Sequence, residues 1–124
     1  TKAYYNLGEI YYFGTGVERD CYKAIQYYIK AAENGNTDAQ YSLGVIYDKG
    51  EDVEQDHNEA IRWYQIAAEH GDVRAQNNLG CIFCSNGNYA KAEYWFRRAS
   101  ELGDIYASEN LKAMLAGSLE STKL

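Results

Sequence analysis

Proline is absent from all 124 residues, although ordinary usage of about 5% would supply about six. Because nothing in the chain removes a backbone donor from a helix interior, it is free to be helical throughout. Long apolar runs are absent too, and no stretch approaches the ~20 residues of a membrane-spanning helix. Basic residues are few, since 12 of them against 18 acidic residues give a net charge of −6. This balance disfavours nucleic-acid binding, which calls for a basic excess.

Cysteine is also scarce, and its pattern is irregular. Cys21, Cys81 and Cys84 are odd in number, so they form no closed disulfide framework, which favours a reducing, cytoplasmic compartment. Cys81 and Cys84 have no second pair, and neither His57 nor His70 has the spacing of a zinc partner. Cys81 and Cys84 also lie late in a predicted helix, whereas redox-active thiols lie at a helix N-terminus, which lowers their pKa. We expect buried or groove-lining thiols, with no metal and no cofactor.

What the sequence does contain is an internal repeat. Leu7-Gly8, Leu43-Gly44 and Leu79-Gly80 follow one another at a constant interval of 36 residues. The third copy is shorter, and it loses residues between Phe83 and Ala92. The other columns that keep step are Tyr11/Tyr47/Phe83, Ala24/Ala60/Ala92, Tyr28/Tyr64/Phe96, Ala31/Ala67/Ala99, Gly35/Gly71/Gly103 and Ala39/Ala75/Ala107.

Each copy has the pattern of two antiparallel helices. Ala3, Leu7 and Tyr11 fall on one face of a first helix, and the second helix shows the same periodicity. Gly35 and Asn36, with their equivalents, provide a helix stop and the next N-cap in two residues. A glycine inside a helix costs ~1 kcal/mol relative to alanine, so we expect a neighbour's ring to fill the space beside each Leu-Gly pair. Such helix pairs stack into a solenoid.

The order A-x-x-x-L-G-x-x-Y, G-x-G-V, D-x-x-K-A, Y-Y-x-x-A-A-x-x-G and A-Q resembles the Sel-1-like repeat, a relative of the tetratricopeptide repeat. The resemblance implies an all-α, right-handed α–α superhelical solenoid in a single domain, 1–117. We expect units at 3–38, 39–74 and 75–106, a capping helix at 105–117 and a polar tail at 118–124. Unit three has the short inter-helix turn of a tetratricopeptide repeat, and Lys112 replaces the helix glycine in the capping helix.

In the family that the chain resembles, first helices line a concave surface that contacts extended peptides or partner helices. The resemblance therefore implies a protein–protein interaction scaffold or adaptor, with another protein or peptide as partner, no nucleic acid and no membrane insertion. Tyrosine suits such a surface because it supplies a large area at low ordering cost. The candidate partner-binding residues are Tyr5, Asn6, Glu9, Tyr12, Asp38, Tyr41, Val45, Asp48, Arg74, Asn77 and Asn78.

Asn6 and Asn78 match a column where tetratricopeptide proteins often place an asparagine that holds the ligand backbone. Tyr5 and Tyr12 have a second interpretation, in which they only seal the N-terminal edge of the stack. We expect no enzyme, because no base, nucleophile or metal set accompanies the single acids such as Glu9 and Asp48.

Two other functions stay open. Some secreted bacterial relatives are linked to cell-wall fragments and β-lactams, which suggests a small-molecule binder or hydrolase; those relatives carry a regular disulfide in each unit, which this chain lacks. In the other, the chain is part of a longer solenoid whose binding surface lies elsewhere. The start at Thr1, without Met or an apolar signal core, leads us to expect an excerpt or a processed chain, whose parent could be secreted.

Overall fold

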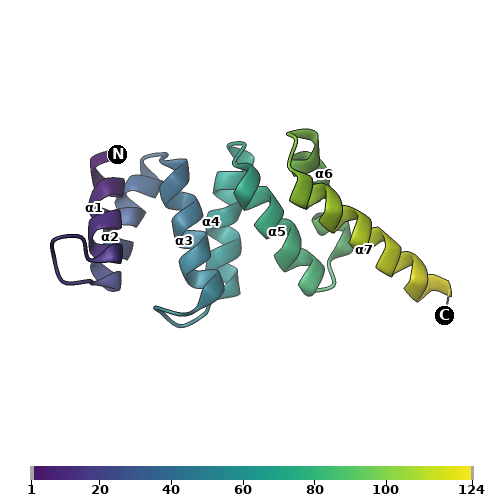
Figure 1. Cartoon of the computed structure of the whole chain (residues 1–124), viewed down its shortest axis with the longest axis horizontal. Helices are drawn as coiled ribbons and strands as arrows, with labels where there is room; N and C mark the ends of the chain where they lie inside the picture. Colours follow the sequence, from purple (N-terminus) through teal and green to yellow (C-terminus); the bar gives the residue numbers. More distant parts are fainter. Residues whose placement is uncertain (1, 124) are drawn as a thin grey trace.

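The computed structural model describes the backbone of residues 2–123 and the side chains of residues 2–117. This part of the chain forms seven helices and no strand. They are α1 (Lys2–Phe13), α2 (Cys21–Glu33), α3 (Thr37–Lys49), α4 (His57–Glu69), α5 (Val73–Ser85), α6 (Tyr89–Glu101) and α7 (Ile105–Lys123). Figure 1 shows them following one another along an elongated molecule, with the two termini at opposite ends. The predicted all-α solenoid of helix pairs is confirmed.

The junctions between units are built as the sequence predicts. Gly35 adopts a φ of +92°, a left-handed conformation that favours glycine, and ends α2. Asn36 then begins α3, because its side chain accepts a hydrogen bond from the Ala39 amide at 2.9 Å. Equivalent pairs occupy 71–72 and 103–104. Each stop and start takes two residues, so consecutive helices run antiparallel.

Within each unit the two helices meet at the Leu-Gly pair. Leu43 and Leu79 are fully buried. The ring of Tyr28 lies against Gly8, where an added Cβ would stand 2.6 Å from Cδ1. Tyr64 packs on Gly44 and Phe96 on Gly80 in the same way. The expectation that each glycine makes room for a neighbour's ring is confirmed.

Buried glutamines join one unit to the next. Gln40 on α3 donates its side-chain amide to the carbonyl of Ala32 on α2 at 3.1 Å. Gln76 donates to the carbonyl of Ala68 in the same geometry, also at 3.1 Å. Both glutamines are almost completely buried. Each adds a hydrogen bond to a carbonyl in the last turn of the preceding helix, which also accepts the backbone amide of the junction glycine, Gly35 or Gly71.

The last helix is longer than the sequence predicts. The predicted capping helix ends at 117, whereas α7 continues to Lys123. Gly117 does not adopt the left-handed conformation of the junction glycines, and the chain has no proline to stop the helix. The side chains of residues 118–124, predicted to form a polar tail, lie outside the described residues. Lys112 is exposed, as expected where no further helix packs.

Candidate partner-binding groove

A row of three cavities follows the first helices of the units. Their volumes are about 130 Å³ between α1 and α3, about 320 Å³ between α3 and α5, and about 400 Å³ between α5 and α7. Tyr41 and Val45 line both the first and the second cavity, and Cys81 and Ser85 line both the second and the third. The three cavities therefore form one elongated surface, which we call the groove.

The first cavity is aromatic and holds one carboxylate. Tyr28 passes across the helix pair from its packing site on Gly8, and its hydroxyl donates a hydrogen bond to Glu9 at 2.7 Å. Burial raises the pKa of Tyr28, and the Glu9 carboxylate raises it further. Tyr5 packs beside Tyr28 with ring centroids 5.8 Å apart, and burial raises its pKa as well. Tyr12 and Tyr41 complete the walls.

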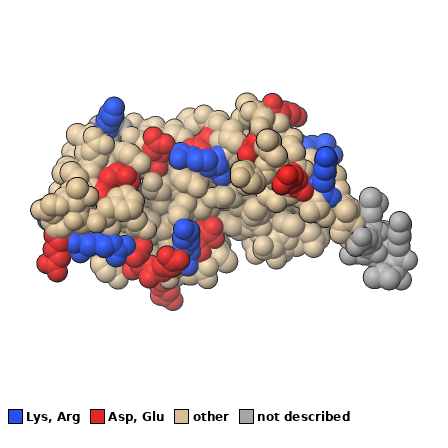
Figure 2. Space-filling view, in the orientation of Figure 1, with Lys and Arg blue, Asp and Glu red and all other residues tan. Residues whose placement is uncertain are grey.

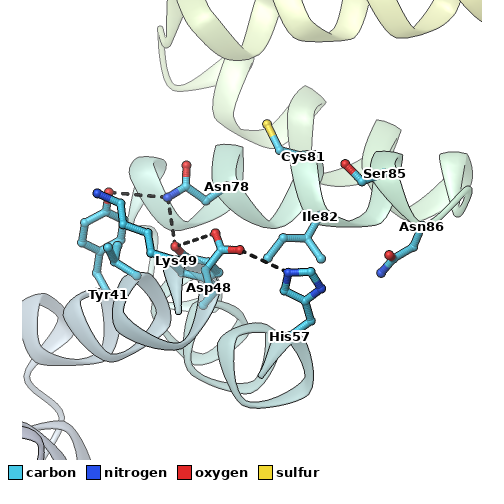
Figure 3. Close-up of a pocket in the computed structure, with 11 residues that line it drawn as sticks. Tyr41, Asp48, Lys49, His57, Asn78, Cys81, Ile82, Ser85 and Asn86 are labelled. Atoms are coloured by element: carbon cyan, nitrogen blue, oxygen red, sulfur yellow. Dashed lines mark hydrogen bonds and ion pairs between the residues drawn. The ribbon is translucent and has the colours of Figure 1, made fainter. Parts of the chain in front are cut away.

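The second cavity contains a hydrogen-bonded network, drawn in Figure 3. The Tyr64 hydroxyl donates a hydrogen bond to Asp48 at 3.3 Å, and burial raises the pKa of Tyr64. Asn78 donates one amide hydrogen toward the Tyr64 hydroxyl at 3.3 Å and another toward the Tyr41 hydroxyl at 3.5 Å. His57 lies 3.7 Å from Asp48 on its other side. Residues of α3, α4 and α5 are thereby held in one arrangement.

Arg74 fixes the position of Tyr41. Its guanidinium lies 4.1 Å from the centroid of the Tyr41 ring, within the range of a cation–π contact. It also forms ion pairs with Asp72 at 2.7 Å and with Asp38 at 2.9 Å. Hydrogen bonding to Asp72 is the main reason that the pKa of Arg74 is raised. Asp38 and Arg74, both predicted to contact a partner, pair with each other beside the groove.

Unit two also reaches back to unit one through its inter-helix loop. Asp52 accepts hydrogen bonds from the Tyr12 hydroxyl at 3.0 Å and from Arg19 at 2.6 Å. Arg19 is the main reason that the pKa of Asp52 is lowered. In unit three a short turn replaces this loop, and Ser85 at the end of α5 and Asn86 in the turn line the larger second cavity. From the sequence alone, Asp52 is notable only because it stands where the repeat pattern has the second glycine of the inter-helix loop.

The third cavity contains the two cysteines of α5. Cys81 and Cys84 line it, where thiols that are buried or line the groove were expected, and burial raises the pKa of Cys81. Asn110 on α7 donates to the side-chain oxygen of Asn77 at 3.0 Å. Asn110 precedes Leu111 as Asn78 precedes Leu79, so the repeat register offered a signal that sequence analysis did not use.

The predicted residues divide into three groups. Glu9, Tyr12, Tyr41, Val45, Asp48 and Asn78 line the groove directly. Tyr5, Asp38, Arg74 and Asn77 lie behind or beside it, in contact with lining residues or their hydrogen-bond partners. Asn6 is exposed on α1 and lines none of the three cavities. Whether these residues bind a partner stays a prediction.

Sequence analysis missed Tyr28, Tyr64 and His57 as groove residues. It assigned the two tyrosines to the packing seam, where their rings do lie, but their hydroxyls reach the groove. The acidic and basic side chains that line the groove are Glu9, Asp48, Lys49 and the imidazole of His57, so the groove is weakly acidic at most. Figure 2 shows acidic and basic side chains interspersed over the visible face of the molecule.

Three helix pairs, a final helix and a groove along the first helices define a helical repeat protein of the solenoid class. The family model of the Sel1 repeat matches residues 1–36, 37–72 and 73–104. The chain belongs to the Sel1 repeat family, as its resemblance predicts. Proteins with this repeat bind other proteins, and the family is typically a non-catalytic scaffold.

Solved structures agree with this assignment. The chain is 41% identical to a protective antigen present in uropathogenic Escherichia coli strains that displays an SLR fold, with a TM-score of 0.83. It is 34% identical to a Sel1 repeat protein from Oxalobacter formigenes, with a TM-score of 0.78. The matches cover 94% and 91% of this chain, but only 26% and 48% of those two chains. No curated protein matches the sequence.

Within the described residues, no three or more His, Cys, Asp or Glu side chains gather as a metal site would require. Over the same part of the chain, no helix is both long enough and apolar enough to cross a membrane.

Proposed function

We propose that this chain is a protein-interaction scaffold whose groove binds a segment of another protein, as an extended peptide or a partner helix. The observation that carries the proposal is the Asn78 network of the second cavity. Both amide hydrogens of Asn78 are directed at tyrosine hydroxyls. Its side-chain oxygen, which accepts no hydrogen bond within the described part of the chain, is left for a backbone N–H of the partner (Figure 3).

The shape of the groove favours an elongated ligand. Three small cavities lie in a row along four helices, so a chain segment can place successive side chains in them. Tyr12, Tyr41 and Tyr64 give the walls large rings with polar ends, which is typical of protein interfaces. The small-molecule alternative gains no support. The relatives linked to that function have a disulfide in every unit, whereas the cysteines of the described residues are free.

The test is selection of a displayed random peptide library on the immobilised protein. Enriched peptides are then measured against Tyr41→Ala and Asn78→Ala by fluorescence anisotropy. We expect each substitution to weaken binding about tenfold or more, as the loss of a central interface residue does. Tyr22→Ala is the matched control, because Tyr22 is 70% exposed on α2 and outside the groove.

Circular dichroism of each variant must first show unchanged helix content. The proposal is wrong if the library yields no binding peptide, or if the peptides bind the groove variants as tightly as they bind the Tyr22→Ala control.

A further inference from the structure

The first cavity differs from the rest of the groove in its charge. Glu9 is the single charged residue that lines it, among the rings of Tyr12, Phe13, Tyr28 and Tyr41. The Tyr28 hydroxyl holds the Glu9 carboxylate from one side at 2.7 Å. No Lys, Arg or His of the described residues forms an ion pair with Glu9. A half-buried carboxyl group thus faces an apolar cavity, and no basic side chain of the described residues pairs with it.

The other carboxylates that accept a tyrosine hydroxyl beside the groove each have a basic side chain of the same chain nearby. Asp52 accepts from Tyr12 and is paired with Arg19 at 2.6 Å. Asp48 has His57 at 3.7 Å. The Arg19 guanidinium also lies 5.1 Å from the centroid of the Tyr12 ring. The chain therefore repeats an arrangement of tyrosine, carboxylate and basic side chain, and at Glu9 none of the described residues supplies the basic side chain.

We propose that the first cavity binds a lysine or arginine side chain of the partner segment, with its cationic end on Glu9. The inference rests on the proposed function, since the basic residue belongs to the segment that occupies the groove. The methylene stem of such a side chain packs on Tyr12, Phe13 and Tyr41, because long basic side chains bury their stems along apolar surfaces. Aromatic faces also attract the cation itself.

The size of the cavity agrees with a single side chain. Its volume of about 130 Å³ is the smallest of the three cavities, which suits a single side chain better than a larger group. Phe13 is 64% exposed, so a ring is available to cover the stem. A hydrogen bond between charged groups in such surroundings is stronger than a neutral one. Glu9 therefore selects for charge as well as for length.

The experiment uses the peptides enriched from the random library described above. In each, the recurrent basic residue is replaced by norleucine, which keeps the stem and removes the charge. Fluorescence anisotropy then gives the affinity of both peptides for the wild type and for Glu9→Gln. We expect the replacement to weaken binding to the wild type about tenfold or more and to Glu9→Gln by no more than about twofold.

Two further variants make the test specific. Glu101→Gln removes the same charge at an exposed position of α6 outside the groove, and it is expected to behave as the wild type. Selection on Glu9→Lys is expected to enrich peptides with an acidic residue at the same position. Circular dichroism establishes that each variant is folded before its affinity is interpreted.

Each outcome has a separate meaning. Peptides that depend on Tyr41 and Asn78 but show no basic position would overturn this inference and leave the proposed function standing. An equal effect of norleucine on the wild type and on Glu9→Gln would also overturn it, because the cation would then be bound elsewhere. A library with no groove-dependent peptide would overturn the proposed function, and this inference with it.

Discussion

Replacement of Gly44 by alanine tests the packing that holds the two helices of one unit together. Gly44 lies inside α3, where a Cβ would contact Cδ1 and Cε1 of the Tyr64 ring well inside van der Waals distance, with Cγ at 2.9 Å. Tyr64 is 1% exposed, so the ring that a Cβ at Gly44 would displace is part of the packed core. The helices must therefore separate, or the ring must leave its preferred rotamer.

Two opposing contributions decide the sign of the change. Overpacking of a filled core costs about 1–3 kcal/mol, and a fixed ring in contact through several atoms places Gly44→Ala toward the upper end. Alanine recovers about 1 kcal/mol of helix propensity relative to glycine. We expect a net destabilisation of about 1–2 kcal/mol. Gly117→Ala is the matched control: its Cβ meets no atom within 4 Å, so it gains propensity only and does not destabilise.

The free energy of unfolding can be measured by urea titration, followed by far-UV circular dichroism and tryptophan fluorescence. Trp63, which is 4% exposed on α4, reports on the same unit as Gly44. If Gly44→Ala were as stable as the wild type or more stable, as expected for Gly117→Ala, the close approach of Tyr64 would not be what requires glycine. The packing argument for all three Leu-Gly pairs would then be refuted.

Two further predictions concern the same core. Leu43→Ala removes a fully buried side chain and should cost about 2–5 kcal/mol; urea unfolding followed separately at Trp63 and Trp95 should show the ends of the solenoid uncoupled, and an unchanged curve would mean that the seam is misplaced. Burial raises the folded-state pKa of Tyr28 and Tyr64, so their contribution to stability should be complete below about pH 10, where unfolded tyrosine ionises, and should fall at higher pH. Tyr28→Phe with Tyr64→Phe should flatten this decline in alkaline urea titrations, and an equally steep decline would contradict the assignment.

The repeat columns predict most of the fold, because each column has a local physical reason. Gly35 and Asn36 end one helix and begin the next through their own backbone and side chain. The constant interval between Leu7 and Leu43 then predicts that the units stack alike. The end of α7 was predicted less well, since Gly117 differs from the junction glycines only in a backbone conformation that the sequence does not specify.

The site was predicted in part. Helical periodicity places Glu9 and Tyr41 on the groove, because the face that a residue occupies depends only on its position along its own helix. Periodicity does not predict that Tyr28 has its ring in the core and its hydroxyl in the groove, since that depends on the length of the side chain across a helix pair. Contacts such as that of Asp52 with Arg19 join segments far apart in the chain, and no repeat column marks them.

The loop that carries Asp52 makes the two halves of the groove mechanically unequal. Beside the first cavity, Asp52 of unit two forms hydrogen bonds with Tyr12 and Arg19 of unit one, in addition to the packing of the helices. Among the described residues, the short turn at 86–88 forms hydrogen bonds only with α5 and α6, beside the second cavity. A segment that binds the groove as we propose would meet a more cross-linked compartment at Glu9 and a less cross-linked one at Asn86. Ligand sequences should accordingly be strict where they face Glu9 and tolerant of substitution opposite Asn86.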